Sequence, residues 1–163
     1  KPGEGFKQML TTLDGGRIGI ASQAIGIGRA TLEEAIEYAQ TREQFGRPIS
    51  SFQAIQWKLA DMATQIYAGR QMLYHAASLR DKKGTAVVKE ASMVKLFCTE
   101  AIGRIADRAV QIHGGMGYMQ EAPIESVYRE VRGMRIYEGT SEIQRLIIAR
   151  DVLKDGLKCL DYD

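Results

Sequence analysis

The 163-residue sequence has few cysteines, few prolines and no long apolar run. Its two cysteines, Cys98 and Cys159, are too few and too far apart for a disulfide framework or a structural zinc site. The longest apolar runs are much shorter than the roughly 20 residues of a membrane-spanning helix, and the first residues do not match a signal peptide. We therefore expect no membrane span and a reducing, intracellular compartment.

The sequence also lacks an excess of charge of either sign. Its 22 basic and 20 acidic residues give a net charge of +2 and are spread along the chain. Basic blocks and basic patches with interleaved aromatic residues are absent, so nucleic acid is not a predicted partner. The two histidines, His75 and His113, have no metal-ligand spacing, and we predict no metal site. The chain begins Lys-Pro-Gly rather than with Met, which suggests a processed product or a domain of a longer protein.

Apolar residues recur at alternating steps of three and four, a spacing typical of amphipathic helices. The pattern predicts long helices over about 14–43, 52–80 and 86–113, a shorter helix over about 123–133 and a last helix over about 141–155. Alternation of apolar and polar residues over the length of a strand is absent. The apolar stripe of the third segment consists of Ala91, Val94, Cys98, Ala101, Ile105, Ala109 and Ile112.

Helices of about 30 residues are about 45 Å long and need neighbours that lie along their length. The connections at 45–51 and 81–85 are short, and short loops between long amphipathic helices make antiparallel neighbours. We therefore predict an all-α fold, an antiparallel four-helix-bundle-like domain with long helices that spans residues 1–163. Gly19, Gly26 and Gly28 disfavour a helix, and we expect them where another backbone packs closely.

The segment Tyr-Glu-Gly-Thr at 137–140 precedes the last predicted helix. Ser141 and Gln144 have the spacing of a capping box, which predicts that this helix begins at Ser141. A carboxylate at this end of a helix is favoured as an anion, and the N–H groups of the first turn can bind phosphate or hydroxyl groups. From these residues alone, Glu138 is either a surface acid in a helix-entry loop or a functional carboxylate.

Two further segments allow a structural and a functional interpretation. The glycines Gly114, Gly115 and Gly117 either end the third helix or let a backbone approach a flat or phosphorylated ligand. Arg42 either complements the dipole of the first helix or, together with Phe45, grips a pyrophosphate. The residues taken one at a time leave both alternatives open.

Six motifs occur in order along the chain: KPGEGF at 1–6, LDGGR at 13–17, TREQFG at 41–46, FQAIQ at 52–56, QIHGGMGY at 111–118 and IYEGTSEIQR at 136–145. Together they resemble the acyl-CoA dehydrogenase family, and most closely its short-chain (butyryl-CoA) type. The resemblance covers essentially the whole chain, and six ordered motifs make a chance match very improbable.

The resemblance implies a flavoenzyme that uses FAD to oxidise an acyl-CoA thioester to the trans-2-enoyl-CoA. In the family a glutamate removes the α-proton of the substrate, and the glutamate of the Tyr-Glu-Gly-Thr motif matches Glu138. Some members instead carry the base on the first helix of the bundle, where this sequence has Gly16. Because glycine cannot act as a base, Glu138 is the candidate catalytic residue.

The remaining site residues also follow from the resemblance, position by position. The substrate-binding residues would be Asp14, Arg17 and Gly139. Some of the FAD-binding residues would contact an FAD held by a neighbouring subunit. The full set for FAD is Arg42, Gln44, Phe45, Gln53, Gln111, Ile112, His113, Gly114, Gly115, Thr140, Ser141 and Glu142.

The resemblance further implies an acyl-CoA substrate, an electron-transfer flavoprotein as electron acceptor and a homo-oligomer, expected to be a tetramer, in a bacterial cytoplasm or the mitochondrial matrix. Family members also have an amino-terminal helical domain and a middle β-domain. We therefore expect these 163 residues alone to be inactive and to bind FAD weakly or not at all. Two alternatives stay open. One is a domain of an acyl-CoA oxidase on the same scaffold, and the other is a non-catalytic helical oligomerisation module.

Overall fold

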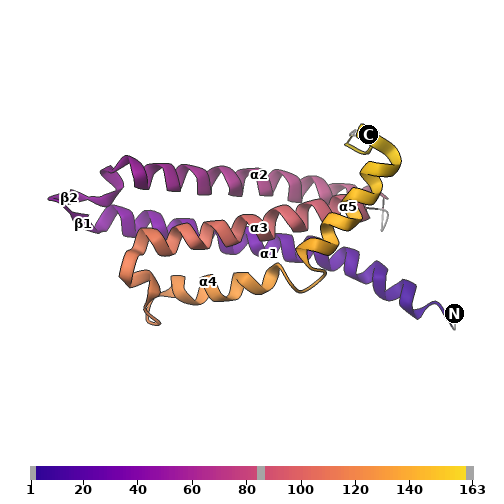
Figure 1. Cartoon of the computed structure of the whole chain (residues 1–163), viewed down its shortest axis with the longest axis horizontal. Coiled ribbons are helices and arrows are strands. Elements are labelled where there is room, and N and C mark those ends of the chain that lie inside the picture. The colour runs from indigo at the N-terminus through magenta and orange to yellow at the C-terminus, as the bar shows by residue number, and fades with distance from the viewer. Residues whose placement is uncertain (1–2, 84–86, 161–163) are drawn as a thin grey trace.

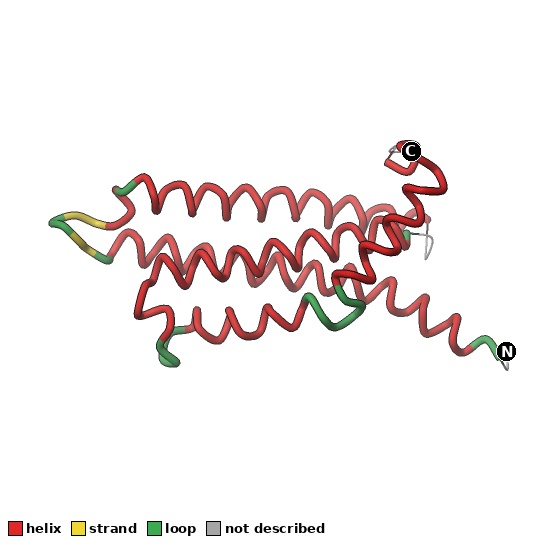
Figure 2. Tube along the Cα trace, in the orientation of Figure 1, coloured by secondary structure: helices red, strands yellow, loops and turns green. Residues whose placement is uncertain are grey.

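The computed structural model describes residues 3–83 and 87–160, apart from the side chains of Lys7 and Asp14. Within these residues it contains five α-helices, which are α1 (Gly5–Thr41), α2 (Gln53–Lys83), α3 (Val88–His113), α4 (Pro123–Met134) and α5 (Ser141–Asp155). Short 3₁₀ helices lie at Ile49–Ser51 (η1), Gly114–Tyr118 (η2) and Gly156–Leu160 (η3). Helix dominates the trace in Figure 2, which confirms the all-α prediction.

Helices α1 to α4 alternate in direction and lie side by side, as the short connections predict (Figure 1). The long helices α1, α2 and α3 have 37, 31 and 26 residues, whereas α4 has 12. Helix α5 crosses the end of the bundle at which α3 begins. Of the predicted loop at 81–85, residues 81–83 belong to α2, and the rest lies outside the described residues.

Helix α3 lies at the centre of the domain and contacts each of the other four helices. Its predicted apolar stripe is buried, with each residue at most 4% exposed. A second stripe on the same helix is also fully buried but polar, and it contains Ser92, Lys95 and Thr99. Because α3 is enclosed on several sides, these polar side chains need hydrogen-bond partners inside the protein.

Helix α1 begins at Gly5 and not near residue 14, so the prediction of its start is wrong. The pair Gly15-Gly16 therefore lies inside the helix. A Cβ atom added at Gly15 would lie 2.4 Å from Arg80 Nη2, and one added at Gly16 would lie 2.5 Å from Glu138 Oε2. The two glycines make room for side chains from other segments and do not mark the beginning of the helix.

The expectation that another backbone packs closely against Gly19, Gly26 and Gly28 is wrong for all three. Gly19 and Gly26 are exposed, and added Cβ atoms would meet no atom of another described segment within 4 Å. Gly28 is buried, but its neighbours are side chains, and its closest contact would be Ile102 Cδ1 at 3.3 Å. A close contact with a core side chain occurs instead at Gly69 of α2, where an added Cβ would lie 2.4 Å from Ile25 Cδ1.

A small hairpin connects α1 to α2, although the sequence contains no strand pattern there. Strand β1 (Glu43–Gln44) pairs antiparallel with β2 (Arg47–Pro48). Its two turn residues, Phe45 and Gly46, have φ of 54° and 76°, as a type I′ hairpin turn requires. Glycine adopts this conformation readily, whereas a phenylalanine rarely does. The turn places the Phe45 ring in solvent, with 92% of its surface exposed.

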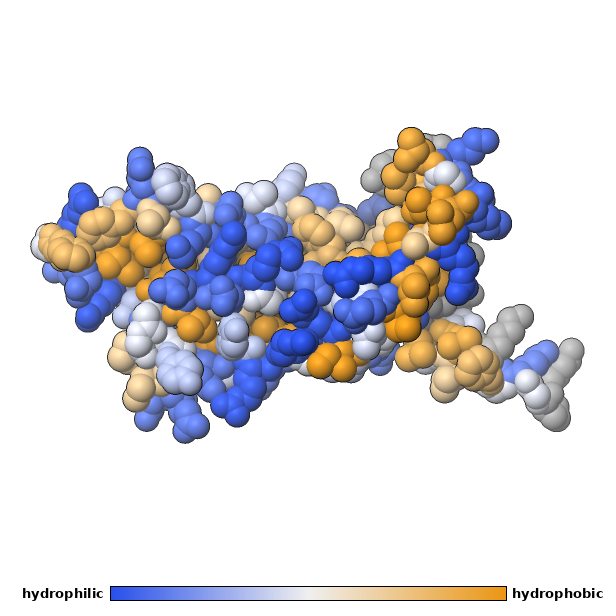
Figure 3. All heavy atoms as spheres, viewed as in Figure 1, coloured by the Kyte–Doolittle hydropathy of each residue, from blue (hydrophilic) through white to orange (hydrophobic). Residues whose placement is uncertain are grey.

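Exposed apolar side chains gather at the two ends of the molecule, over the hairpin and along α5 and η3 (Figure 3). Leu153 and Leu157 are 86% and 80% exposed. Exposed apolar patches of this kind often mark surfaces that another protein segment covers. Among residues 3–83 and 87–160, no helix combines the length and the apolar character of a membrane span.

The two classes of helix glycine predict opposite effects of alanine. We expect Gly26→Ala to stabilise the chain by about 0.5–1 kcal/mol, because it reduces the entropy of the unfolded state without a clash. Gly69→Ala should destabilise it by about 1 kcal/mol, because the new methyl group overlaps Ile25 in the core. Each change corresponds to about 2–4 °C in the thermal midpoint, measured by circular dichroism. Equal stabilisation by both variants would contradict the close packing at Gly69.

Candidate active site

The turn between α4 and α5 carries Glu138 in an uncommon backbone conformation. Glu138 has φ of 57°, and Gly139 has φ of 89°. A residue other than glycine in this region costs about 1–3 kcal/mol and persists only where the surrounding structure enforces it. The Ser141 N–H closes the turn by donating to Arg135 O at 3.0 Å. Residues in strained backbone conformations cluster at functional sites, so this conformation makes Glu138 a candidate functional residue.

Two fully buried side chains hold the middle of this turn. Gln144 donates from Nε2 to Glu138 O at 3.3 Å and to Gly139 O at 3.0 Å. Lys95 donates from Nζ to Gly139 O at 2.7 Å. A Cβ atom added at Gly139 would lie 2.5 Å from Gln144 Nε2, so glycine both permits the backbone conformation and leaves room for the amide.

The Glu138 carboxylate lies against α1, beside Gly16. Its Oε2 atom is buried and accepts no hydrogen bond from the residues that the structure describes. The next residue of α1, Arg17, is only 7% exposed, and its Nη1 donates to Ser92 Oγ at 3.5 Å. Its Nη2 lies 3.9 Å from the position of a Cβ atom added at Gly139. A buried carboxylate oxygen with no donor is available to accept a proton.

The charges around this turn are coupled. Burial lowers the pKa of Lys95, and the nearby Arg17 charge lowers it further. The carboxylates of Glu100, Glu138 and Glu142 act in the opposite direction, but the pKa of Lys95 stays below its ordinary value of 10.5. Lys95 therefore contacts the turn through Gly139 O and also interacts with Glu138 through its charge.

Glu100 of α3 anchors the start of α5. Its Oε1 accepts from Ser141 Oγ at 2.7 Å and from Arg135 Nε at 2.9 Å, and its Oε2 pairs with Arg135 Nη2 at 2.7 Å. Burial by itself raises the pKa of Glu100. The hydrogen bonds from Ser141 and Arg135 and the charges of Arg135 and Arg145 lower it more, so the pKa lies below its ordinary value of 4.5.

The predicted capping box of α5 is wrong. The N-cap is Thr140, whose Oγ1 accepts from the Ile143 N–H at 3.3 Å. Ser141 is instead the first helical residue, and its hydroxyl donates to Glu100. The Gln144 amide turns toward the carbonyls of the preceding turn. Ser141 has its partner on α3 and Gln144 has its partners in the turn before α5, and neither interaction belongs to a capping box.

A second group of predicted residues meets at the opposite end of the bundle. There an open groove of about 890 Å³ lies between the end of α1, the hairpin and the start of η2. The predicted residues that line it are Arg42, Gln44, Phe45, Ile112, His113, Gly114 and Gly115. Gln53 and Gln111 are exposed close by in the sequence and are not part of this lining.

The side chains of this groove suit a flat or anionic ligand. The His113 ring stacks on Tyr38 with a centroid distance of 4.3 Å. Its Nδ1 lies 2.8 Å from Ala109 O, and because a carbonyl only accepts, Nδ1 carries the proton. The Phe45 ring packs edge to face against Phe52 at 6.1 Å. The exposed Phe45 ring, together with the Arg42 guanidinium and the glycine backbone of the same groove, offers stacking and charged hydrogen bonds.

The two groups of predicted residues are far apart within one chain. Arg17 and Arg42 are about 25 residues apart along α1, which corresponds to about 38 Å. Thr140, Ser141 and Glu142 lie at the Glu138 end, because they follow it directly at the start of α5. The side chain of Asp14, the remaining predicted substrate residue, lies outside the described part of the chain.

The arrangement agrees with a known family. A family model described as acyl-CoA dehydrogenase, C-terminal domain, matches residues 3–153. The chain belongs to the acyl-CoA dehydrogenase family. This membership confirms the family resemblance of the six motifs.

Relatives from this family cover most of the chain. The mitochondrial short-chain specific acyl-CoA dehydrogenase of Sus scrofa is 51% identical over 154 residues, which are 94% of this chain and 37% of that protein. The caffeyl-CoA reductase–Etf complex subunit CarC of Acetobacterium woodii is 49% identical over 151 residues, 93% of this chain and 40% of that protein. The structure of butyryl-CoA dehydrogenase from Megasphaera elsdenii matches with a TM-score of 0.90 and 42% identity, over 94% of this chain and 40% of that one. The chain therefore spans about 40% of the length of such acyl-CoA dehydrogenase relatives.

The sequence interpretation missed three residues of the site. Lys95, Glu100 and Gln144 contact the turn or its flanks, yet no motif singled them out for that role. One signal was present: Lys95 has Ser92 and Thr99 on the same face of α3, at steps of three and four, beside the apolar stripe. A lysine enclosed in this way needs a buried acceptor.

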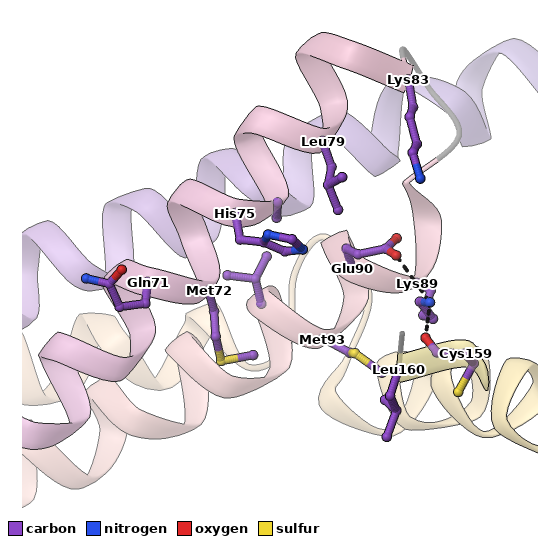
Figure 4. A pocket seen from close by; sticks show the side chains of 12 residues that line it. Gln71, Met72, His75, Leu79, Lys83, Lys89, Glu90, Met93, Cys159 and Leu160 are labelled. Atoms are coloured by element: carbon purple, nitrogen blue, oxygen red, sulfur yellow. Dashed lines mark hydrogen bonds and ion pairs between the residues drawn. The ribbon is translucent and has the colours of Figure 1, made fainter. Parts of the chain in front are cut away.

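A further pocket of about 390 Å³ lies between α2, α3 and η3 (Figure 4). Lys89 joins α3 to η3 beside it, since its Nζ donates to Cys159 O and pairs with Glu90 at 3.2 Å. None of the predicted site residues lines this pocket, so it is separate from the candidate active site. In the described ranges, no group of three or more His, Cys, Asp or Glu side chains could hold a metal ion.

The Glu100 network predicts a pH-dependent contribution to stability. Because the pKa of Glu100 is lower in the folded state, its contribution is complete above the unfolded pKa and is lost as the pH falls through the folded pKa. Glu100→Gln should therefore cost about 2 kcal/mol near pH 7. The difference from wild type should shrink between about pH 6 and about pH 3 in urea unfolding. A difference that is constant or grows toward low pH would contradict this role.

Proposed function

We propose that this chain is the carboxy-terminal domain of an FAD-dependent acyl-CoA dehydrogenase and that Glu138 removes the α-proton of the thioester. The observation that carries the proposal is the Glu138 carboxylate, which has a buried oxygen without a hydrogen bond from the described residues. It stands on a turn in a left-handed conformation beside Arg17, in a chain of this family. The spatial neighbour of that oxygen is Gly16, the other position at which family members carry the base.

In the proposed reaction the bond between the α-carbon and its hydrogen breaks, and the proton moves to a carboxylate oxygen of Glu138. General-base catalysis of this kind contributes about 10²–10⁴-fold. Gly139, Arg17 and Asp14 are the proposed substrate-binding residues near the thioester. The space at the missing Cβ of Gly139 is taken by the Gln144 amide, and the Arg17 guanidinium lies next to it. Substrate that covers the carboxylate removes water from it and strengthens the interactions within the site.

The residues of the groove at the hairpin fit a nucleotide cofactor. Arg42 can bind a diphosphate, and the exposed Phe45 can stack on an adenine. The backbone at Gly114 and Gly115 is open to a ligand, because a Cβ added at either would meet no atom of another described segment within 4 Å. The start of α5, with Thr140, Ser141 and Glu142, offers the positive end of a helix dipole to the same class of ligand. When bound, FAD would be the acceptor of the β-hydrogen, which leaves the substrate as a hydride to give the 2-enoyl-CoA.

The distance between the two groups of residues supports a homo-oligomer, which we propose to be a tetramer. Because they lie about 38 Å apart on one chain, the groove at the hairpin serves an FAD held by a neighbouring subunit. The exposed apolar surface at both ends of the chain is consistent with burial against other subunits or domains (Figure 3). The proposed electron acceptor of the reduced enzyme is an electron-transfer flavoprotein. The proposed location of the enzyme is a bacterial cytoplasm or the mitochondrial matrix.

A second candidate function is the reverse reaction, reduction of a 2-enoyl-CoA. It is favoured by the 49% identity to a caffeyl-CoA reductase subunit. In that direction the Glu138 carboxylic acid returns its proton to the α-carbon, so the same residue serves both reactions. An acyl-CoA oxidase would differ by reaction of its reduced flavin with oxygen. A non-catalytic oligomerisation module would show no flavin reduction by any acyl-CoA.

The first test replaces the proposed base. We expect Glu138→Gln in the full-length, FAD-containing enzyme to abolish bleaching of the flavin by butyryl-CoA, or by whichever acyl-CoA reduces the wild type fastest. An amide cannot accept the α-proton, so the rate should fall by at least about 10²-fold while FAD stays bound. Anaerobic stopped-flow absorbance measures the rate. A variant that bleaches at a near-native rate removes Glu138 from this role.

The second test moves the carboxylate without changing it. In Gly16→Ala the new Cβ would lie 2.5 Å from Glu138 Oε2, so the carboxylate has to shift. We expect a loss of at least about tenfold in the rate of flavin reduction, because misplacement of a reacting group by about 1 Å can cost 10²-fold. Thermal stability should be unchanged or higher, since alanine favours the helix.

Gly15→Ala is the matched control for this test. It lies on the same turn of α1, and its new Cβ would displace the flexible Arg80 guanidinium at 2.4 Å instead of the carboxylate. The control should gain the same helix propensity and keep a near-native rate of flavin reduction. Equal losses of rate in both variants would mean that the contact between Gly16 and Glu138 has no specific effect.

A further inference from the structure

The conformation of the Glu138 turn needs a cause inside the protein. Glutamate is not a residue that favours positive φ, and two successive residues of this turn adopt it. The Ser141 N–H secures only the end of the turn. The carbonyl oxygens of Glu138 and Gly139 themselves accept hydrogen bonds from side chains, those of Lys95 and Gln144. These two side chains fix the direction in which the Glu138 side chain leaves the backbone.

Lys95 is an unusual residue to find at this position. It is 0% exposed, and a lysine is almost never fully buried unless its ammonium group has a strong partner. Its neighbours on the buried stripe of α3, Ser92 and Thr99, donate to the Val88 and Lys95 carbonyls of their own helix. The Lys95 ammonium instead reaches across to Gly139 O, in the turn that carries Glu138.

Gln144 supports the same turn from the other side. Its Nε2 donates to both carbonyls, while its Oε1 is buried and accepts no hydrogen bond from the described residues. A carbonyl oxygen cannot donate, so the amide has to present its nitrogen to the turn. A buried amide oxygen without a hydrogen bond costs free energy. The orientation of the Gln144 amide is therefore set by the two hydrogen bonds that its nitrogen donates to the turn.

We infer that Lys95 and Gln144 are positioning residues of the dehydrogenase reaction. By donating to Glu138 O and Gly139 O, they hold the turn in its left-handed conformation and aim the Glu138 carboxylate at the α-carbon. This inference rests on the proposed function of Glu138. Neither residue touches the reacting atoms, and each acts through the backbone of the turn.

The experiment uses the full-length, FAD-containing enzyme with Lys95→Met and, separately, Gln144→Met. Methionine keeps a similar volume and removes the donor. We expect the limiting rate of flavin reduction by butyryl-CoA to fall at least about tenfold per bound FAD, because the carboxylate is no longer held in place. The butyryl-CoA concentration for half-maximal rate and the FAD content should change little. The thermal midpoint of Lys95→Met should fall, because Gly139 O loses one of its two side-chain hydrogen-bond donors, so the rate is compared per bound FAD.

Cys98→Ala is the matched control, because Cys98 is a fully buried residue of the same helix that faces Gly69 of α2 and not the turn. It should lower the thermal midpoint and leave the limiting rate per bound FAD at the wild-type value. Native limiting rates in both methionine variants would overturn the inference. So would losses of rate that disappear when corrected for FAD content.

If Lys95→Met does not fold, Gln144→Met alone decides between these outcomes. The Glu138→Gln variant tests the proposed function independently of the two methionine variants. Abolished bleaching in Glu138→Gln together with native rates in both methionine variants refutes only the positioning role. Persistent bleaching in Glu138→Gln refutes the proposed base and, with it, this inference.

Discussion

The enclosure of α3 by the other four helices constrains the rest of the structure. Part of the enclosed surface of α3 is polar, and its Lys95 and Glu100 lie on the side that faces α5 and the turn before it. Each finds its partner there, Lys95 at Gly139 O and Glu100 at Ser141 and Arg135. The polar side of α3 thus determines where α5 begins and how the residues ahead of it are folded.

The same constraint explains why the candidate base has its particular setting. The turn is held from α3 and α5, while α1 passes beneath the carboxylate with glycine at the contact point, Gly16. A residue with a side chain at position 16 would overlap the Glu138 carboxylate where it now lies. The two positions that the family resemblance suggests for a base, 16 and 138, are therefore neighbours in space.

The opposite end of the bundle has a different character. The hairpin turn at Phe45 and Gly46 exposes an aromatic ring, and His113 and the glycines after it form the other wall of an open groove. Since α1 runs along the length of the bundle, with Gly16 near one end and this groove at the other, the groove and Glu138 do not converge within one chain (Figure 1). The residues that the family resemblance assigns to FAD thus lie in two separate groups, and this separation is the reason for proposing a homo-oligomer.

The sequence by itself determined the helices and their buried faces, because apolar spacing of three and four reports one side of a helix directly. Its six motifs also pointed to the family and, through the Tyr-Glu-Gly-Thr segment, to Glu138. It placed the start of α1 near residue 14 instead of Gly5 and the cap of α5 at Ser141 instead of Thr140. Gly15, Gly16 and Ser141 instead contact the side chains of Arg80, Glu138 and Glu100 from distant segments. Only the tertiary structure decided which groups meet Glu138, since Lys95 is 43 residues away in the chain, and hydrogen bonds between such distant residues leave no local pattern.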